Sequence, residues 1–501
     1  MKNLKIAAFL FIFSFINESS AQTIRPHHWL MDEAGYYWNR GYLWHVSPLQ
    51  RPLTLQQLNS ALRKVENSPE APSLKMLHYV PRRENAETAC IWLEAENTFR
   101  RDDDRSYLHA VQRAGAGIRL NSTIQIFGNF NLDNRLDADS SYIGERQNGF
   151  AAFMEQAYIR AEWKRFTVVF GRDYLVWGPG LDASLHISDY SRPMDHLFIS
   201  WQNRFLQLSY FTATLDKTKF AVDGEEAEQN RRLSGHRIEV RPWTFFRIGL
   251  SETALFGGPD AGADYAFVNP LLLYTGVEQN GPQKANVMAS LDMTILLKRC
   301  FSIYGSFLLD DFQFENSTAD DRGEPAEIGC LAGANWADPF SIRGLDLFAE
   351  YTRVTNRTYN GQGGPWEKYL HRNRAIGHFL GNDFERTILG VRYRNSAKLA
   401  LATRYEHRRR GEGRIEKPFD MPWRDVPPGE TYSEPFPTGV IESSDIFQFS
   451  CRWQPFPWLR TEVHVAHFSV VNLENQPGAD ENFWQAGLNV SFELYRSISF
   501  P

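Results

Sequence analysis

The sequence predicts an all-β transmembrane protein, an antiparallel outer-membrane β-barrel of about eighteen strands preceded by a small, partly helical region. Three observations lead to this fold class. The chain begins with a stretch typical of exported proteins, most of it alternates between apolar and polar residues, and its short and long connections follow one another strictly in turn.

The first residues have the composition of a secretory signal peptide. Lys2 and Lys5 precede an apolar run over 6–16, and the small residues of 19–21 follow. The run is about half of the ~20 residues that a membrane-spanning helix needs, which favours cleavage after Ala21 over a retained anchor. We therefore treat 1–21 as a signal peptide.

Composition narrows the class of protein further. The mean hydropathy is −0.43 and no later stretch is apolar for long enough to span a bilayer as a helix, so a helical membrane protein is excluded. Aromatic residues make up 14% of the chain, which is expected where rings line two membrane interfaces. The net charge of −6 is mild and no basic domain emerges, so we expect no nucleic-acid partner.

The four cysteines, Cys90, Cys300, Cys330 and Cys451, lie far apart and form no CxxC pair. A zinc or redox site is therefore not indicated, and we expect neither a metal nor a cofactor. Disulfides are chemically possible after export. The simpler interpretation is that these are small residues within strands, unpaired or with one incidental bridge.

Residues 22–85 differ from everything that follows. From Thr54 the sequence TLQQLNSALRKV spaces its leucines as in a helix, and Thr54 and Gln57 occupy the positions of a capping box. The aromatic segment from Trp29 to Trp44 is a candidate for another helix. We predict a small periplasmic, partly helical region whose docking place stays open.

Residues 86–501 are predicted to form the barrel, because the hydrophobic period changes from helical to two at about residue 88. The last segment shows the pattern best. Six apolar residues alternate there with polar or small ones over some eleven positions, the length that a tilted strand needs to cross a bilayer: Trp484, Ala486, Leu488, Val490, Phe492 and Leu494.

The connections separate a membrane barrel from a soluble β-sandwich. Short turns near residues 121, 164, 203, 242, 298, 338, 395 and 455 alternate with longer connections at 101–106, 133–149, 173–196, 216–232, 257–284, 313–327, 354–386, 408–443 and 472–481. A membrane barrel requires tight periplasmic turns and long external loops, whereas a sandwich has no reason for this asymmetry. Lipid offers no hydrogen bonds to the backbone groups at an open sheet edge, so the strands must close into a cylinder.

One stretch resembles a known family. Residues 170–201 read FGRDYLVWGPGLDASLHISDYSRPMDHLFISW, which is similar to the signature of the capsule assembly protein Wzi family. The segments FVNP at 267–270 and RAIGHFLGND at 374–383 agree with it, whereas 408–443 matches nothing that we can place. The resemblance implies an eighteen-stranded outer-membrane barrel that acts as a lectin and holds exported polysaccharide at the cell surface.

The candidate ligand-binding residues lie in two of the long loops. They offer rings for stacking and charged groups for hydroxyls or acidic sugars: Arg172, Asp173, Trp177, Asp189, Arg192, Trp366, Arg372, Arg374 and His378. For the first loop an alternative is structural, with Trp177 packing the loop into the lumen and Arg172 forming an internal ion pair with Asp173. For the second loop, binding and loop folding are equally open.

Two further clusters have simpler explanations. His186, Asp189, Asp195 and His196 match no recognised metal spacing. Arg408, Arg409 and Arg410 are predicted to begin an external loop as a solvated run near lipopolysaccharide phosphates. The expected partners are outer-membrane lipid and lipopolysaccharide, surface polysaccharide, and the barrel-insertion machinery during assembly.

Three function classes follow from these features. The first is a protein that binds capsule or exopolysaccharide at the cell outer membrane. The second is a porin-like diffusion channel, which requires an open lumen. The third is an outer-membrane hydrolase, and here the sequence contains no GxSxG or HExxH motif, so we expect no catalytic residues.

Overall fold

The computed structural model describes residues 23–58 and 88–499, except for residues 56, 103–104, 122, 137–138, 140–141, 143, 148, 223–224, 259–264, 281–284, 312–322, 397 and 428–429. The predicted signal peptide and most of the helix predicted from Thr54 onward lie outside these described residues.

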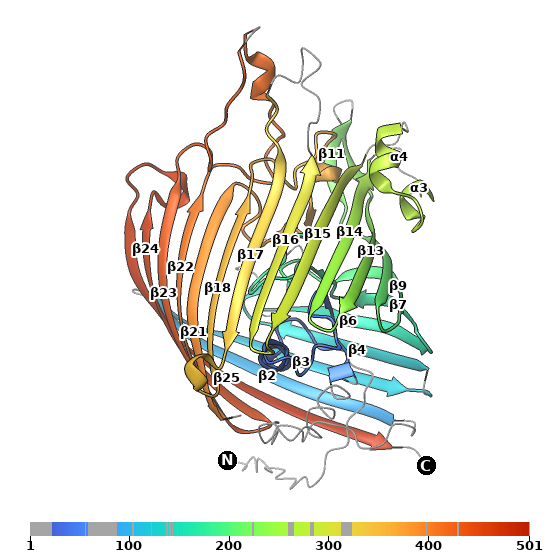
Figure 1. Cartoon of the computed structure of the whole chain (residues 1–501), viewed down its shortest axis with the longest axis vertical. Coiled ribbons are helices and arrows are strands. Elements are labelled where there is room, and N and C mark those ends of the chain that lie inside the picture. Colours follow the sequence, from blue (N-terminus) through green and yellow to red (C-terminus); the bar gives the residue numbers. More distant parts are fainter. Residues whose placement is uncertain are drawn as a thin grey trace, which may run out of the picture.

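Eighteen antiparallel strands close into one barrel, which confirms the predicted fold class (Figure 1). Each strand pairs with its neighbour along the chain, and the last strand pairs with the first from Thr88 opposite Ser499 to Asp102 opposite Gln485. This pairing satisfies both backbone edges, as a lipid environment demands. One short extra strand, β5, pairs with β6 over two residues.

The barrel strands are β2 (Thr88–Asp102), β3 (Arg105–Arg119), β4 (Ile124–Asp133), β6 (Phe150–Trp163), β7 (Phe166–Asp173), β9 (Met194–Gln202), β10 (Leu206–Thr214), β13 (Arg231–Trp243), β14 (Phe246–Gly257), β15 (Asn286–Leu297), β16 (Phe301–Asp311), β17 (Glu327–Ala337), β18 (Leu345–Val354), β21 (Phe384–Ser396), β22 (Leu399–Arg410), β23 (Glu442–Phe456), β24 (Leu459–Val471) and β25 (Glu481–Ser499).

The remaining elements lie in the N-terminal region and the connections. They are α1 (Trp29–Asn39), β1 (Gln50–Arg51), β5 (Arg146–Gln147), β8 (Val176–Trp177), β11 (Thr218–Val222), β12 (Glu225–Gln229), α3 (Tyr265–Val268), α4 (Tyr274–Asn280), β19 (Leu370–His371) and β20 (Arg374–Ala375), with 3₁₀ turns η3 (Pro339–Ser341), η4 (Pro365–Glu367), η5 (Pro422–Asp425) and η6 (Leu473–Asn475).

The connections alternate as the sequence predicts, and the end with the long loops is the extracellular one by the rule for such barrels (Figure 1). Two boundaries differ. The connection predicted at 101–106 is shorter in the structure, because the pairing of β2 with β3 extends to Asp102 opposite Arg105. The arginines at 408–410 belong to β22 and not to a loop, because backbone pairing with β21 continues to Arg410.

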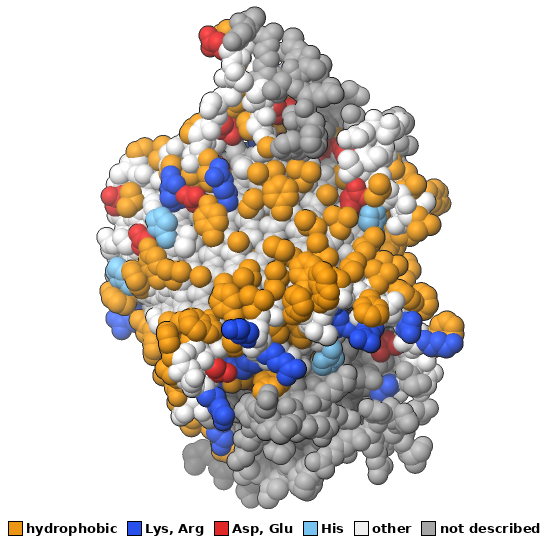
Figure 2. All heavy atoms as spheres, in the orientation of Figure 1, with side chains coloured by type: hydrophobic (Ala, Val, Ile, Leu, Met, Phe, Trp, Pro, Cys, Tyr) orange, Lys and Arg blue, Asp and Glu red, His pale blue; other side chains and the backbone are white. Residues whose placement is uncertain are grey.

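Exposed large apolar side chains occur on most of the barrel strands, and on the face shown in Figure 2 they gather into a band. On β25, Trp484 and Leu488 are exposed, whereas Asn489 points inward and donates to Glu96 Oε1 and Thr98 Oγ1, each at 2.9 Å. This confirms the alternation that the sequence shows for the last strand. Within the described part of the chain, no helix has the length and apolarity needed to span a membrane.

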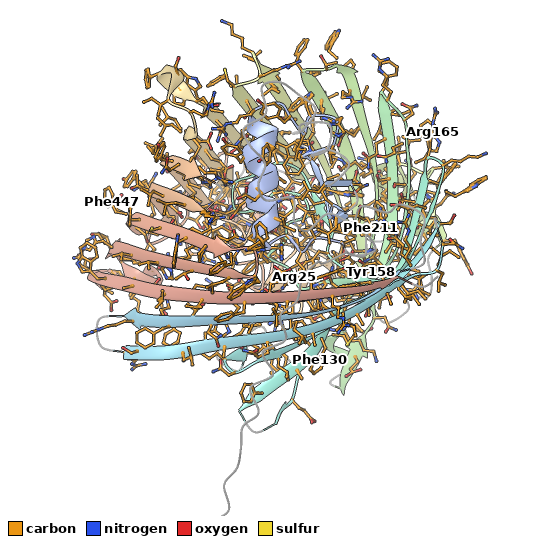
Figure 3. The ribbon with its side chains drawn as sticks, turned by 90° about the horizontal axis from the view of Figure 1, so that it is seen from below. Arg25, Phe130, Tyr158, Arg165, Phe211 and Phe447 are labelled. Carbon is orange, nitrogen blue, oxygen red and sulfur yellow. The ribbon has the colours of Figure 1, made fainter. Side chains whose placement is uncertain are left out.

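Residues 23–58, here called the plug, lie inside the barrel (Figure 3). The candidate helix is confirmed as α1, which begins after His28, whose ring nitrogen accepts from the Leu30 backbone. The capping box is also confirmed: Thr54 N–H donates to Gln57 Oε1 at 3.0 Å, and Gln57 N–H donates to Thr54 Oγ1 at 3.1 Å. Apolar residues on either side of the helix give the plug its own small core.

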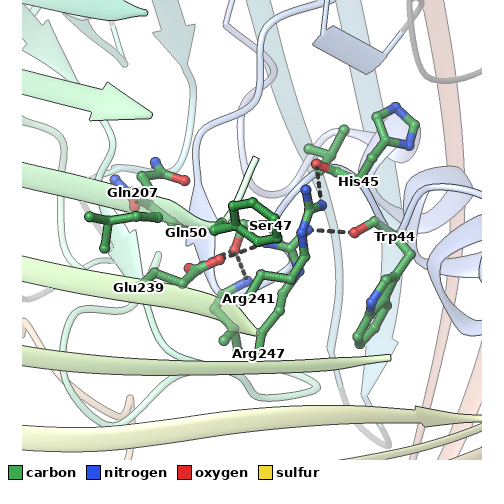
Figure 4. A network of polar contacts seen from close by, with 12 residues as sticks. Trp44, His45, Ser47, Gln50, Gln207, Glu239, Arg241 and Arg247 are labelled. Carbon is green, nitrogen blue, oxygen red and sulfur yellow. Dashed lines mark hydrogen bonds and ion pairs between the residues drawn. The ribbon is translucent and has the colours of Figure 1, made fainter. Parts of the chain in front are cut away.

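Buried polar contacts attach the plug to the barrel wall. Arg40 reaches Asp346 at 2.9 Å near the periplasmic turns, and Ser47 donates to Glu239 at 2.8 Å (Figure 4). Arg25, deeper in the lumen, pairs with Glu94. Since a buried charge is costly unless it is paired, these contacts hold the plug in one position.

Two extracellular loops fold into the lumen above the plug. Residues 174–193 and 355–383 meet there in a large apolar core, which includes Trp177, Tyr359 and Ile376 and packs against wall residues such as Phe211. The plug and these two loops therefore occupy the lumen over the described residues. An open channel would need this space.

A third loop folds outward instead. Its helices α3 and α4 cover the outer face of β13 and β14, where Glu252 accepts from the backbone N–H groups of Tyr274 and Thr275, each at 2.8 Å. His236, also on the outer face, lies 3.1 Å from Glu252. This loop, called the flap, keeps a polar pair on the outer wall away from lipid.

The cysteines occupy four separate places in the barrel. Cys90, Cys330 and Cys451 lie in strands, and Cys300 lies in the turn before β16. All four are free thiols in the structure.

Candidate functional site

The structure divides the candidate ligand-binding residues among different places. Asp189, Arg192 and Arg374 meet in one pocket inside the extracellular end of the barrel. Arg172 lies on the outer wall. The others are buried in the lumen or support a second extracellular loop.

Trp177 is fully buried and packs the 174–193 loop into the lumen. Its ring meets Phe211 edge-on at a centroid distance of 5.0 Å, and the following Gly178 N–H donates to the Leu49 carbonyl of the plug at 2.9 Å. Gly180 closes the turn with φ +150°, and a Cβ there would lie 1.9 Å from the Ala183 carbonyl oxygen. The structural alternative describes this residue, since the ring offers no face to a sugar.

Arg172 and Asp173 point to opposite sides of the barrel wall. Arg172 donates to both carboxylate oxygens of Asp195 on the outer face, at 2.8 and 2.6 Å. Asp173 faces inward and accepts from Thr23 Oγ1 of the plug at 3.0 Å and from Gln156 at 2.8 Å. The internal Arg172–Asp173 ion pair is therefore wrong, because neighbouring residues of a strand face opposite ways.

Two buried histidines of the inward loops, His186 and His378, are packing residues, whereas the buried His371 lies 3.0 Å from Asp216. His378 stacks on Phe379 and Phe384 with centroid distances of 4.6 Å, and burial holds its pKa well below the usual value. Burial likewise lowers the pKa of His186 to about 3. Among the described residues, no group of three or more His, Cys, Asp or Glu side chains could hold a metal ion.

The pocket that unites Asp189, Arg192 and Arg374 has a volume of about 390 Å³ and is here called the arginine pocket. Its wall comes from β3, β4 and β6, and the 174–193 loop and His27 of the plug complete it. Its other lining residues include Arg135, Asp139 and Phe153. These three have no distinctive sequence signal, because their neighbours in the pocket come from loops far along the chain.

Asp139 joins the two loop arginines. Its Oδ2 accepts from Arg192 at 2.7 Å and also from Arg374, so two guanidinium groups share one carboxylate. Burial and the neighbouring Arg374 lower the pKa of Arg192, yet the group stays charged at neutral pH because arginine titrates so high. The guanidinium of Arg192 also lies 5.5 Å from the ring centroid of Phe153. Together, Arg192, Arg374 and Asp139 therefore carry a net positive charge beside an aromatic ring.

Arg135 adds a further cation to the same pocket. Its guanidinium lies 3.8 Å from the ring centroid of Tyr107, and within the described residues it has no carboxylate partner. Asp189 lies on another side, 3.7 Å from the plug residue His27. The pocket thus combines fixed cations, carboxylate oxygens and a ring. This combination can pair with anionic groups and hydrogen-bond hydroxyls.

A second extracellular pocket, of about 650 Å³, lies between the loops at 216–218, 361–373 and 416–419. Lys368 lines it, and burial lowers the pKa of this lysine to about 8. The candidates Trp366 and Arg372 support its walls. The Trp366 carbonyl accepts from Arg231 at 3.1 Å, and the Arg372 N–H donates to Asp216 at 2.8 Å. Sequence reasoning pointed to this loop but not to Lys368.

Comparison with known proteins agrees with the fold. The family model described as capsule assembly protein Wzi matches residues 93–483. Among solved structures, Wzi of Escherichia coli, described as a carbohydrate-binding β-barrel involved in group 1 capsule assembly, has 13% sequence identity and a TM-score of 0.59, over 97% of this chain and 99% of that chain.

Two barrels of Pseudomonas aeruginosa are also similar. OprD has 10% identity and a TM-score of 0.46, with 81% of this chain and 95% of that chain covered. OccD3 has 10% identity and a TM-score of 0.47, with 81% and 91% covered. No curated protein matches the sequence significantly.

Proposed function

The chain belongs to the capsule assembly protein Wzi family and is a β-barrel of the outer membrane; from this premise we propose that it binds exported capsule or exopolysaccharide and helps to attach or assemble it at the cell surface. The arginine pocket is the observation that carries the proposal for this chain. It lies at the extracellular end, where an exported polymer is present.

The chemistry of this pocket suits an acidic polysaccharide. Arg192 and Arg374 are held in place by Asp139, so little side-chain freedom is lost when a sugar carboxylate binds. Arg135 is available for a charge-assisted hydrogen bond. Asp189 and the ring of Phe153 add an acceptor and an apolar surface for neutral parts of the sugar.

A diffusion channel is the weaker candidate function. Passage through the barrel would have to avoid the plug and both inward loops. In the described part of the chain the plug strand β1 pairs with β8 of the first loop, and the two loops share one apolar core with the wall. We also propose a binding protein and not an enzyme, because Arg192 and Arg374 are fixed in ion pairs with Asp139, an arrangement that suits recognition.

Polysaccharide retention on intact cells tests the proposal. The variant Arg192→Ala should weaken binding by roughly tenfold or more, since a hydrogen bond to a charged group contributes about 1.5–3 kcal/mol. Arg374→Ala should act in the same direction. The matched control is Arg172→Ala, which removes an arginine from the outer wall, outside the pocket.

Heat-modifiable gel mobility and protein level establish that each variant is folded. If Arg192→Ala and Arg374→Ala both fold and retain as much polysaccharide as Arg172→Ala and the parent, the arginine pocket is not the binding site.

A further inference from the structure

Another pocket lies at the opposite, periplasmic end of the lumen, between the plug and the inner wall (Figure 4). Its volume is about 260 Å³. The plug contributes residues 45–53 to it, and the wall contributes the periplasmic ends of β9, β10 and β13. We call it the periplasmic pocket. It shares no lining residue with the second extracellular pocket or the arginine pocket, apart from Tyr174 deep in the lumen.

Three arginines that have no ion-pair partner among the described residues line the periplasmic pocket. Arg51 comes from the plug, Arg204 from the turn between β9 and β10, and Arg241 from the inner face of β13. Within the described residues none of them forms an ion pair, and the Nε of Arg51 is buried without a hydrogen-bond partner. The two carboxylates nearby are already engaged: Glu239 pairs with Arg247 at 2.8 Å, and Asp173 accepts from the plug.

Arg241 is positioned by the backbone. Its Nε donates to the Arg204 carbonyl at 3.1 Å, and its Nη1 donates to the His45 carbonyl of the plug at 3.4 Å (Figure 4). Carbonyl groups fix the direction of a guanidinium without forming an ion pair with it, and Glu239, the carboxylate that acts on Arg241 from a distance, is already paired with Arg247. The side chain is therefore ready to meet an anion without further ordering.

From this geometry we propose that the periplasmic pocket binds a carboxylate- or phosphate-bearing group presented from the periplasm. Three cations that form no ion pair within the described residues repel one another around this pocket, and an anion relieves that repulsion. Guanidinium groups also match carboxylate and phosphate oxygens in pairs. Beside them, Gln50 and Gln207 line the pocket, and the Gln207 side-chain amide donates to Gln50 Oε1 at 3.0 Å, which extends the polar lining toward sugar or glycerol hydroxyls.

The same chemistry occurs in an acidic sugar unit and in a phospholipid headgroup of the inner leaflet. This inference goes beyond the proposed function and does not depend on it, because its residues lie at the other end of the barrel. If the arginine pocket proves not to bind polysaccharide, the inference about the periplasmic pocket is unaffected. If the periplasmic pocket binds no anion, the proposed function is likewise unaffected.

Isothermal titration of the purified full-length protein in detergent tests the proposal with two probes, inorganic phosphate and trigalacturonate. The parent should bind both. Arg241→Gln and Arg51→Gln should each lower the affinity by at least about tenfold, the effect of losing one charge-assisted hydrogen bond. The matched control is Arg165→Gln, which removes an exposed arginine at the same end that points away from the lumen (Figure 3).

The proposal is overturned if the folded parent binds neither probe, or if Arg241→Gln, Arg51→Gln and Arg165→Gln all bind like the parent. Repeating the trigalacturonate titration in nanodiscs separates the two sources. A weaker affinity in phosphatidylglycerol than in phosphatidylcholine nanodiscs supports a lipid headgroup that competes for the pocket. Equal affinity in both supports an acidic sugar.

Discussion

Asp182 shows how one side chain joins an inward loop to the barrel wall. Its two oxygens accept from Arg404 at 3.0 and 2.6 Å, and it also pairs with Arg386. Burial alone would raise the pKa of Asp182, but Arg386 and Arg404 outweigh it and hold this pKa below its usual value. The carboxylate therefore contributes stability that is present above the unfolded pKa and is lost as the pH falls toward the lower folded pKa.

Asp182→Asn should destabilise the protein by about 1.5–3 kcal/mol at neutral pH, because it leaves the two guanidinium groups with less compensation. The measurement is urea unfolding of parent and variant in lipid vesicles at several pH values. The difference between them should narrow below about pH 4, where the unfolded parent becomes protonated. A difference that stays constant down to pH 2 would contradict this account.

Trp177 allows packing and binding to be separated. Trp177→Ala should cost about 3–5 kcal/mol, because it removes a large fully buried ring from the luminal core. Urea unfolding of the parent and the variant measures this loss in the free energy of unfolding. Polysaccharide retention per folded molecule should stay at the parental level, since the ring has no exposed face. A folded variant of parental stability that fails to retain polysaccharide would show that Trp177 touches the ligand.

Single residues were predicted less well than their motif. The Trp-Gly-Pro-Gly stretch was recognised from the sequence, but whether Trp177 faces a ligand or the core depends on the plug. Arg172 and Asp173 could be separated only once the register of β7 was known, because strand alternation places one outside and the other inside. Arg192 and Arg374 were candidates from the sequence. Their shared partner Asp139 was not, because it belongs to another loop.

Among the larger elements, the flap is held on the outer wall by a carboxylate, a tyrosine hydroxyl and an apolar cluster. Glu252 receives the backbone N–H groups at the start of α4 and so fixes the flap on the outer wall. Phe267 and Tyr274 are fully buried beneath it. Glu252 is therefore a local anchor for α4, and the Tyr210 hydroxyl, which donates to the Val268 carbonyl at 2.6 Å, is a second one at the end of α3.

Glu252→Ala should release the flap and expose Phe267 and Tyr274 to chymotrypsin. In the detergent-solubilised variant, cleavage within residues 265–280 should be several-fold faster than in the parent. Mass spectrometry of the fragments measures this rate. Glu385→Ala is the matched control, since it removes an outward carboxylate that pairs with Arg409 on the wall. If both variants are cleaved at the parental rate, Glu252 does not hold the flap.

Strands were the most predictable elements, because alternation along a strand is a local property that lipid on one side and polar groups on the other impose together. The capping box at Thr54 was also predictable, because it too is a local pattern: its two residues lie three positions apart. The position of the plug was not. Its attachment uses pairs such as Arg40 with Asp346, and nothing in the sequence distinguishes this pair from many others of the same charge.

At the scale of the whole molecule, the plug and the inward loops divide the lumen into two ends. The arginine pocket opens toward the extracellular loops, and the periplasmic pocket lies among the turns. Ion pairs fix the plug near both ends, with Arg25 beside Glu94 and Arg40 beside Asp346. Without the plug and the inward loops, a barrel of about eighteen strands would enclose an aqueous passage.

The protein should therefore conduct poorly in planar lipid bilayers, and loosening the plug should raise the conductance. The double variant Arg25→Ala and Arg40→Ala removes an ion pair at each end of the plug, and each loss of one partner in a buried pair costs about 3–5 kcal/mol. Channel openings should become frequent in this variant. Arg165→Ala, which removes an exposed arginine outside the lumen, should stay as closed as the parent. A parent that conducts as readily as the double variant would mean that the plug does not close the barrel, and the diffusion channel would then become the better description of this protein.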